Sequence, residues 1–168
     1  MFTATLITMG GVLLCIVIPY LLGSINFGLI ISNKKFHDDI RTHGSGNAGA
    51  TNMLRTFGWK AGVLTMAGDM LKAVIAVGLG YLVVGINAEV TDANGVTYRM
   101  VDQFGAAIAG LFVMLGHMFP IFFKFKGGKG VATSGMVIIM ISPITAVFCL
   151  IIFLIIVIGT RYVSLGSV

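Results

Sequence analysis

The chain has 168 residues, of which 57% are hydrophobic and only 10% are charged, and its formal net charge is +5. Soluble domains carry about 25% charged residues, so this composition excludes an ordinary soluble domain and indicates an integral membrane protein. The chain is too short for a large transporter with two repeated halves, and it contains no internal repeat or low-complexity segment.

The apolar runs predict the spanning helices, because a helix needs about 20 mostly apolar residues to cross a bilayer. Residues 1–33 carry no charge, whereas a signal peptide begins with basic residues, so we expect an uncleaved first span. Its helical pattern can run on to about residue 32. The predicted spans cover roughly 4–24, 61–86 and 104–123, and further apolar sequence covers 131–159.

The loops between these runs predict the orientation. Segments 33–60 and 124–130 are basic, whereas 87–103 is net acidic and contains the turn signal Asn94-Gly95. Lys and Arg concentrate on the cytoplasmic side of membrane proteins, and two spans separate the basic loops. We therefore expect both basic loops in the cytoplasm, and the N-terminus and 87–103 outside. This placement favours membrane orientation over nucleic-acid binding.

The stretch 131–159 allows two interpretations. A single span would leave Arg161 outside, whereas two short helices meeting near Pro143 would return it to the cytoplasmic side. We prefer the second interpretation, which rests in part on the family resemblance given below. Cys15 and Cys149 lie inside apolar runs without CxxC spacing, so no disulfide or metal site is predicted.

Residues 44–52 read GSGNAGATN and match GxGxxG. A dinucleotide site is not favoured, because no strand or βαβ unit surrounds the pattern. Glycines let backbone N–H groups turn toward an anion, small polar side chains add donors, and an arginine supplies a fork-shaped phosphate ligand. A polar turn that caps the next helix remains the alternative. The predicted phosphate-binding residues are Gly44, Ser45, Gly46, Asn47, Thr51, Asn52 and Arg55.

Residues 125–133 read FKGGKGVAT and form a second glycine-rich, cationic segment. The spacing is not that of a P-loop, yet the segment directly precedes a predicted helix, whose N-terminus favours anions. The alternative is a loop that only anchors the orientation of the chain. The predicted phosphate-binding residues here are Lys126, Gly127, Gly128, Lys129, Gly130 and Thr133.

Three further polar residues lie inside predicted spans. Asp69 and Lys72 are three apart, on one helix face, and charges inside a bilayer are usually paired or functional. They form either a neutralised structural pair or a support behind the phosphate loops, and His117 is a packing residue or part of that support. A third segment, RYVSLGS at 161–167, adds Arg161, Ser164 and Ser167 as possible anion contacts.

These three segments together resemble the acyl-phosphate-dependent glycerol-3-phosphate acyltransferase family, the PlsY type. The similarity runs in order through GSGNAGATN with Met-Leu-Arg, then GHMFPIFFKFKGGKGVAT, then RYVSLGS. It implies an all-α integral membrane protein, a multi-span helical bundle with an extracellular N-terminus, in the bacterial plasma membrane. It also implies an active site that faces the cytoplasm, on a single transmembrane acyltransferase domain over residues 1–168.

The resemblance implies transfer of a fatty acyl group from acyl phosphate to the 1-hydroxyl of glycerol 3-phosphate. The products are lysophosphatidic acid and phosphate, in the first step of bacterial phospholipid synthesis, without a cofactor, nucleic acid or obligate protein partner. By position in the motifs, Ser45, Arg55, Lys129 and Ser167 resemble the residues that act in catalysis. The glycine-rich segment resembles the family's phosphate-binding loop.

The end of the chain departs from the family pattern. Family members continue past this point with another apolar segment and a basic tail that carries histidine, asparagine and glutamate. This chain ends at Val168, which predicts about five spans here against seven in the family, and a fragment or an inactive protein. A transporter or channel for an anionic metabolite is the alternative function, because glycine-rich breaks and buried charges occur there too.

Overall fold

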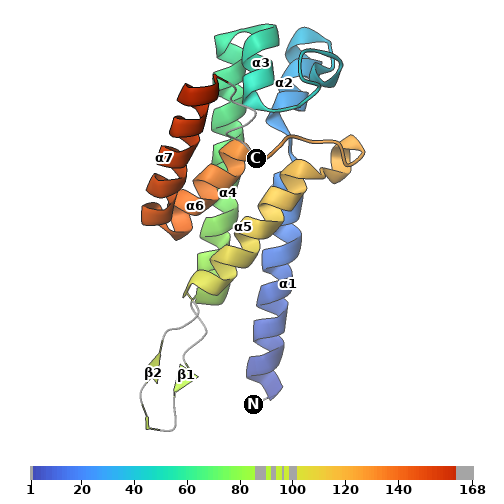
Figure 1. Cartoon of the computed structure of the whole chain (residues 1–168). Coiled ribbons are helices and arrows are strands. Elements are labelled where there is room, and N and C mark those ends of the chain that lie inside the picture. The colour runs from blue at the N-terminus through green and yellow to red at the C-terminus, as the bar shows by residue number, and fades with distance from the viewer. Residues whose placement is uncertain (1, 86–89, 92–93, 96, 99–101, 162–168) are drawn as a thin grey trace.

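The computed structural model describes residues 2–85, 90–91, 94–95, 97–98 and 102–161 (Figure 1). Ser164 and Ser167 therefore lie outside the described residues. The described residues form helices and one short hairpin. The elements are α1 (Phe2–Ser24), α2 (Phe27–Phe36), η1 (Ile40–Thr42), α3 (Ala50–Phe57), α4 (Trp59–Gly85), β1 (Val90–Thr91), β2 (Thr97–Tyr98), α5 (Asp102–Met118), η2 (Ile121–Phe123), α6 (Val131–Ile141) and α7 (Pro143–Thr160).

The core of the bundle forms where α4 and α5 pack together with α6, and α1 packs against it. Small residues dominate it, and a Cβ at Gly116 would meet the backbone carbonyl of Tyr20, while one at Gly80 would meet that of Gly105. Helix association in a bilayer depends on close van der Waals packing, which small residues permit. The buried cluster consists of Ala73, Ala76, Val77, Ala106, Val113 and Val137.

Four stretches of the described residues are long and apolar enough to cross a membrane. This agrees with an all-α, multi-span membrane protein. The fifth apolar helix, α6, is 11 residues long and is too short to span. The long stretches are Gly10–Phe36, Trp59–Val83, Gln103–Phe123 and Pro143–Thr160.

The first stretch is broken between α1 and α2. The side chain of Asn26 adopts the N-cap position of α2 and accepts a hydrogen bond from the backbone N–H of Leu29 at 3.1 Å. The expected continuation of the helical pattern to about residue 32 is therefore present, but as a separate helix that extends to Phe36. The break leaves backbone carbonyls near the end of α1 without helical partners.

The stretch after the glycine-rich loop forms two helices, as expected, with Ser142 between them and Pro143 in the first turn of α7. Only α6 is short, because α7 has 18 residues. In Figure 1, α7 runs back toward the end of the molecule where α3 lies. None of the residues of α7 is fully buried, and most of its apolar side chains are exposed.

The two ends of the bundle differ in the way that the loop charges predict. Figure 1 shows the N-terminus and the β1–β2 hairpin at one end, and α2 and α3 at the other. The hairpin pairs Val90 with Tyr98 and Thr91 with Thr97, on either side of the expected Asn94-Gly95 turn. The basic segment 33–60 and the β1–β2 hairpin, which comes from the segment 87–103, thus lie at opposite ends.

Candidate functional site

The loop before α3 is held in shape by Asn52, which is 3% exposed. Its side-chain amide donates to the carbonyl oxygens of Ile40 at 3.2 Å, His43 at 2.9 Å and Asn47 at 3.0 Å. Its oxygen accepts from the backbone N–H of Ser45 at 3.1 Å. Asn52 was predicted as a phosphate ligand, but these bonds already engage its amide, so its role is to shape the loop.

Glycines in the same loop adopt backbone conformations that other residues avoid. Gly44 and Gly46 have φ values of +54° and +69°, in the left-handed region that favours glycine. Gly44 also lies against the Asn52 amide, without room for a Cβ. The N-cap of α3 is Gly49, and no side chain caps this helix, which argues against the alternative that the polar residues of the loop serve as caps.

The second glycine-rich segment pairs with the end of α5. The backbone N–H of Gly127 donates to the carbonyl of Met118 at 3.1 Å, and that of Gly128 donates to the carbonyl of His117 at 3.2 Å. A Cβ at Gly127 would meet the His117 carbonyl, and one at Gly128 would meet the His117 imidazole. Gly127 is therefore needed because the two backbones approach closely, and Gly128 because the imidazole lies against it.

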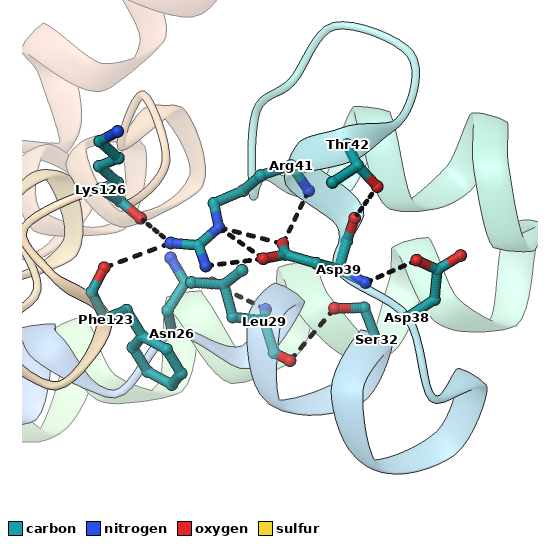
Figure 2. A network of polar contacts seen from close by, with 9 residues as sticks. All are labelled: Asn26, Leu29, Ser32, Asp38, Asp39, Arg41, Thr42, Phe123 and Lys126. Atoms are coloured by element: carbon teal, nitrogen blue, oxygen red, sulfur yellow. Dashed lines mark hydrogen bonds and ion pairs between the residues drawn. The ribbon is translucent and has the colours of Figure 1, made fainter.

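Arg41 joins the two loops, as Figure 2 shows. Its Nη1 donates to the carbonyl of Phe123 at 3.2 Å and to that of Lys126 at 3.3 Å. Asp39 holds the guanidinium at 2.7 Å from Nη2, and this hydrogen bond lowers the pKa of the Asp39 carboxyl. Sequence reasoning missed this link, although an acidic and a basic residue two positions apart were a signal for it.

A cavity of about 340 Å³ opens between the two loops and the helices beneath them. Its lining includes the cations Arg55 and Lys129 and also apolar side chains, among them Met66 from α4 and Phe153 from α7. The pocket therefore suits an amphipathic anion. Its lining residues are Ser45, Asn47, Gly49, Ala50, Thr51, Asn52, Arg55, Met66, Asp69, His117, Lys129, Gly130, Val131, Ala132 and Phe153.

The other predicted site residues lie around this cavity. Lys126, Gly127 and Gly46 line a neighbouring hollow together with Arg41 and Lys124. Thr133, predicted as a phosphate ligand, is instead fully buried, and its hydroxyl lies 3.5 Å from the backbone carbonyl of Asp69. That position packs α6 on α4 and does not line the cavity.

Asp69, Lys72 and His117 form one buried cluster at the base of the pocket. Lys72 Nζ lies 2.9 Å from Asp69 Oδ1 and 2.9 Å from His117 Nδ1. Asp69 and His117 also line the cavity. The cluster is therefore a neutralised pair that also reaches the cavity, and its role as a support behind the predicted phosphate loops stays a prediction.

The geometry can be compared with known proteins. Residues 13–168 match a family model described as glycerol-3-phosphate acyltransferase. The glycerol-3-phosphate acyltransferase of Bacillus subtilis (strain 168) is 44% identical over 154 residues, which cover 92% of this chain and 71% of the relative. That of Ureaplasma urealyticum serovar 10 is 42% identical over 166 residues, with 96% of this chain and 64% of the relative covered.

A solved structure also resembles this chain. The crystal structure of PlsY (YgiH), an integral membrane glycerol 3-phosphate acyltransferase in its glycerol 3-phosphate form, is 41% identical with a TM-score of 0.76. The match covers 93% of this chain and 70% of that one. The chain thus spans 64% to 71% of the length of these relatives and of that structure.

Proposed function

The chain belongs to the glycerol-3-phosphate acyltransferase family, and we propose that it transfers a fatty acyl group from acyl phosphate to the 1-hydroxyl of glycerol 3-phosphate. The products are lysophosphatidic acid and inorganic phosphate, which makes this the first step of bacterial phospholipid synthesis. One observation carries the proposal: the same pocket is lined by two cations, Arg55 and Lys129, and by apolar side chains such as Met66 and Phe153. Both proposed substrates carry phosphate, and one also carries a long acyl chain.

The residues of the pocket divide the work of binding. Arg55 supplies a planar fork of donors for phosphate oxygens, and Lys129 supplies a second positive charge beside Gly130. Ser45 and Asn47 add neutral donors on the opposite loop. The first carbons of the acyl chain fit the apolar wall that Met66 and Phe153 form with α6.

The proposed reaction depends more on positioning the two substrates than on activating either of them. The hydroxyl oxygen of glycerol 3-phosphate attacks the carbonyl carbon of acyl phosphate, and the bond between that carbon and the phosphate oxygen breaks. Phosphate leaves with the electron pair, and a phosphate oxygen of the substrate accepts the hydroxyl proton. Positioned substrates and donors aimed at the developing charge supply the rate enhancement. A pH–rate profile that requires an enzymic group titrating near neutral pH would contradict this proton route.

The pocket lies where the charge pattern predicts the cytoplasm. The basic loop 33–60 contributes Ser45, Asn47 and Arg55 to it, and the loop 124–130 contributes Lys129. Since basic loops stay on the cytoplasmic side, we assign this protein to the bacterial plasma membrane with the pocket open to the cytoplasm, where both substrates are made available.

The test is an acyltransfer assay in lipid mesophase or detergent with palmitoyl phosphate and labelled glycerol 3-phosphate. The 168-residue chain is compared with the same chain extended by the C-terminal segment of the Bacillus subtilis relative. Lysophosphatidate from either chain supports the proposal, and activity only in the extended chain adds that the further segment is needed. If neither chain makes product while both remain folded, the proposed activity is wrong.

A further inference from the structure

The Lys72 ammonium has a complete set of acceptors inside the bundle. Its Nζ lies 3.0 Å from the carbonyl oxygen of Gly23, 2.9 Å from that of Ile25 and 2.9 Å from Nδ1 of His117. An ammonium carries three donors and no acceptor. The two carbonyls lie at the break between α1 and α2, so each proton of this 3% exposed lysine has one partner.

Asp69 balances the charge of this lysine without taking one of its protons. Its Oδ1 lies 2.9 Å from Lys72 Nζ, yet no directed hydrogen bond reaches this buried oxygen among the described residues. His117 Nδ1 is farther from the same oxygen, at 3.4 Å. The nearest hydrogen-bonding partner of Nδ1 is therefore the ammonium, and the carboxylate acts through its charge.

This arrangement fixes the proton of the imidazole. An ammonium only donates, so Nδ1 of His117 must accept, and an accepting Nδ1 carries no hydrogen. The ring is then neutral, with its single N–H on Nε2. A proton on Nδ1 would face a proton of Lys72 at a nitrogen separation of 2.9 Å, which is repulsive. The groups that face Nδ1 from α4 are Lys72 and Asp69.

The other edge of the ring lies against the second glycine-rich loop, and the residue lines the pocket. Nε2 is the atom nearest to the position that a Cβ of Gly128 would occupy, and His117 lines the cavity beside Lys129. The residue is 2% exposed, and within the described part of the chain no hydrogen-bond partner of Nε2 is found. An N–H at Nε2 is therefore available to donate to a ligand that enters the cavity.

We propose that His117 is a neutral hydrogen-bond donor, through Nε2–H, to a substrate phosphate oxygen, and that Lys72 is the positioning residue that fixes this tautomer. The inference rests on the proposed function for the identity of the phosphate, which either glycerol 3-phosphate or acyl phosphate provides. It excludes His117 as the base, because Nε2 is already protonated and Nδ1 is held by Lys72.

The first experiment observes the tautomer directly and needs no activity. The chain is labelled with 15N-histidine, and the spectrum of the His117→Gln variant identifies the His117 resonances by their loss. At pH 7 we expect a protonated Nε2 and an unprotonated Nδ1, with the Nε2 signal shifting when inorganic phosphate is added. A protonated Nδ1, an imidazolium ring, or no shift with phosphate at any concentration overturns the proposal.

The second experiment measures the KM for glycerol 3-phosphate and for palmitoyl phosphate separately. His117→Leu removes the donor, and we expect the KM of one substrate to rise by about ten- to a hundredfold, the loss typical of a hydrogen bond to a charged group. His117→Gln keeps a nitrogen donor and should recover a large part of that loss. The substrate whose KM changes is the one that His117 binds.

Lys72→Met tests the positioning role. We expect it to mix the two tautomers in the 15N spectrum and to raise the same KM that His117→Leu raises. Equal losses in His117→Gln and His117→Leu, in variants whose thermal unfolding is unchanged, would overturn the donor role. If the unaltered chain makes no lysophosphatidate in any form, the proposed function fails, while the 15N spectrum with phosphate still decides this inference.

Discussion

At the scale of single residues, Arg55 and Lys129 are the two cations among the described residues that line the cavity. Arg55 lies in α3 and Lys129 in the loop before α6, 74 positions apart in the chain (129 − 55), and neither forms an ion pair with a described acidic residue. Their charge is therefore free to act on a bound anion. Lys34, by contrast, is exposed in the last turn of α2 and does not line the cavity.

We expect Arg55→Ala and Lys129→Ala each to lower kcat/KM for acyl transfer by about ten- to a hundredfold, because each removes a charge-assisted phosphate contact. Lys34→Ala serves as the control for a lost surface charge and should change the rate less than about twofold, as for a typical exposed position. The measurement is steady-state acyltransfer with both substrates varied. Equal effects of all three substitutions would contradict the assignment of the pocket.

Gly128 is the residue that lets the second loop lie on the imidazole of His117. Because a Cβ at Gly128 would overlap the ring, Gly128→Ala must displace either His117 or the loop, and we expect activity to fall at least about tenfold, as for misplaced catalytic groups. Gly135→Ala is the matched control, since no atom lies within 4 Å of its added Cβ. The rates and the thermal unfolding of both variants are compared. A fully active Gly128→Ala protein would show that the loop contact is not needed.

At the scale of elements, Arg41 connects η1 to the turn after η2, and Asp39 holds its guanidinium in place. Lys124 and Phe125 in that turn both have positive φ, +57° and +58°, which non-glycine residues adopt uncommonly. Arg41 hydrogen-bonds the carbonyls on either side of them, at Phe123 and Lys126. The pair therefore supports a backbone conformation that the turn would not keep alone.

The contribution of the Asp39–Arg41 pair to stability should decrease as the pH is lowered. The hydrogen bond from Arg41 lowers the pKa of the Asp39 carboxyl in the folded protein. The pair therefore stabilises the fold fully above the pKa of an unfolded Asp, about 3.9. This stabilisation is lost as the pH falls through the lower pKa of the folded protein. We expect the thermal unfolding temperature of the chain to fall below about pH 4, and the Asp39→Asn variant to lack this part of the decrease. If the unfolding temperatures of the two proteins fall equally with pH, the pair does not contribute to stability in this way.

The contact between α1 and α5 depends on glycine at the crossing. A Cβ at Gly116 would meet the backbone of α1 at Tyr20 and Ser24, and backbone atoms cannot rotate away as a side chain can. We therefore expect Gly116→Ala to destabilise the bundle by about 1–3 kcal/mol, the usual cost of overpacking. Gly78→Ala on α4 has no atom within 4 Å of its Cβ and should not destabilise it. Thermal unfolding in one detergent compares the two variants.

At the scale of the whole molecule, the separation of charge between the two ends decides which side the pocket faces. We expect Asn94→Cys, in the exposed turn of the hairpin, to react with a membrane-impermeant maleimide added to intact cells. Lys35→Cys, which is exposed at the opposite end, should react only after permeabilisation. Both are made with Cys149 replaced by serine, because Cys149 is exposed. The reverse pattern would place the pocket outside.

Much of this molecule could be predicted from local sequence. Apolar runs of spanning length predict the helices because a bilayer excludes unpaired backbone groups, and the positions of lysine and arginine predict the orientation. The glycine-rich loops predict an anion site, because glycine fits backbone that turns its N–H groups toward a ligand, and this site stays a prediction. The pairing of Asp69 with Lys72 followed from their spacing on one helix face.

Only the tertiary structure decided which polar side chains remain available to a ligand. Asn52 and Thr133 were predicted as ligands, but the fold uses Asn52 to shape its loop and buries Thr133 against α4. Local sequence predicts no role for Arg41, yet its guanidinium hydrogen-bonds the second loop at Lys126, 85 positions away in the chain. The physical reason is that a side chain's hydrogen bonds depend on what packs against it from distant parts of the chain, whereas local sequence encodes only its own helix, turn or loop.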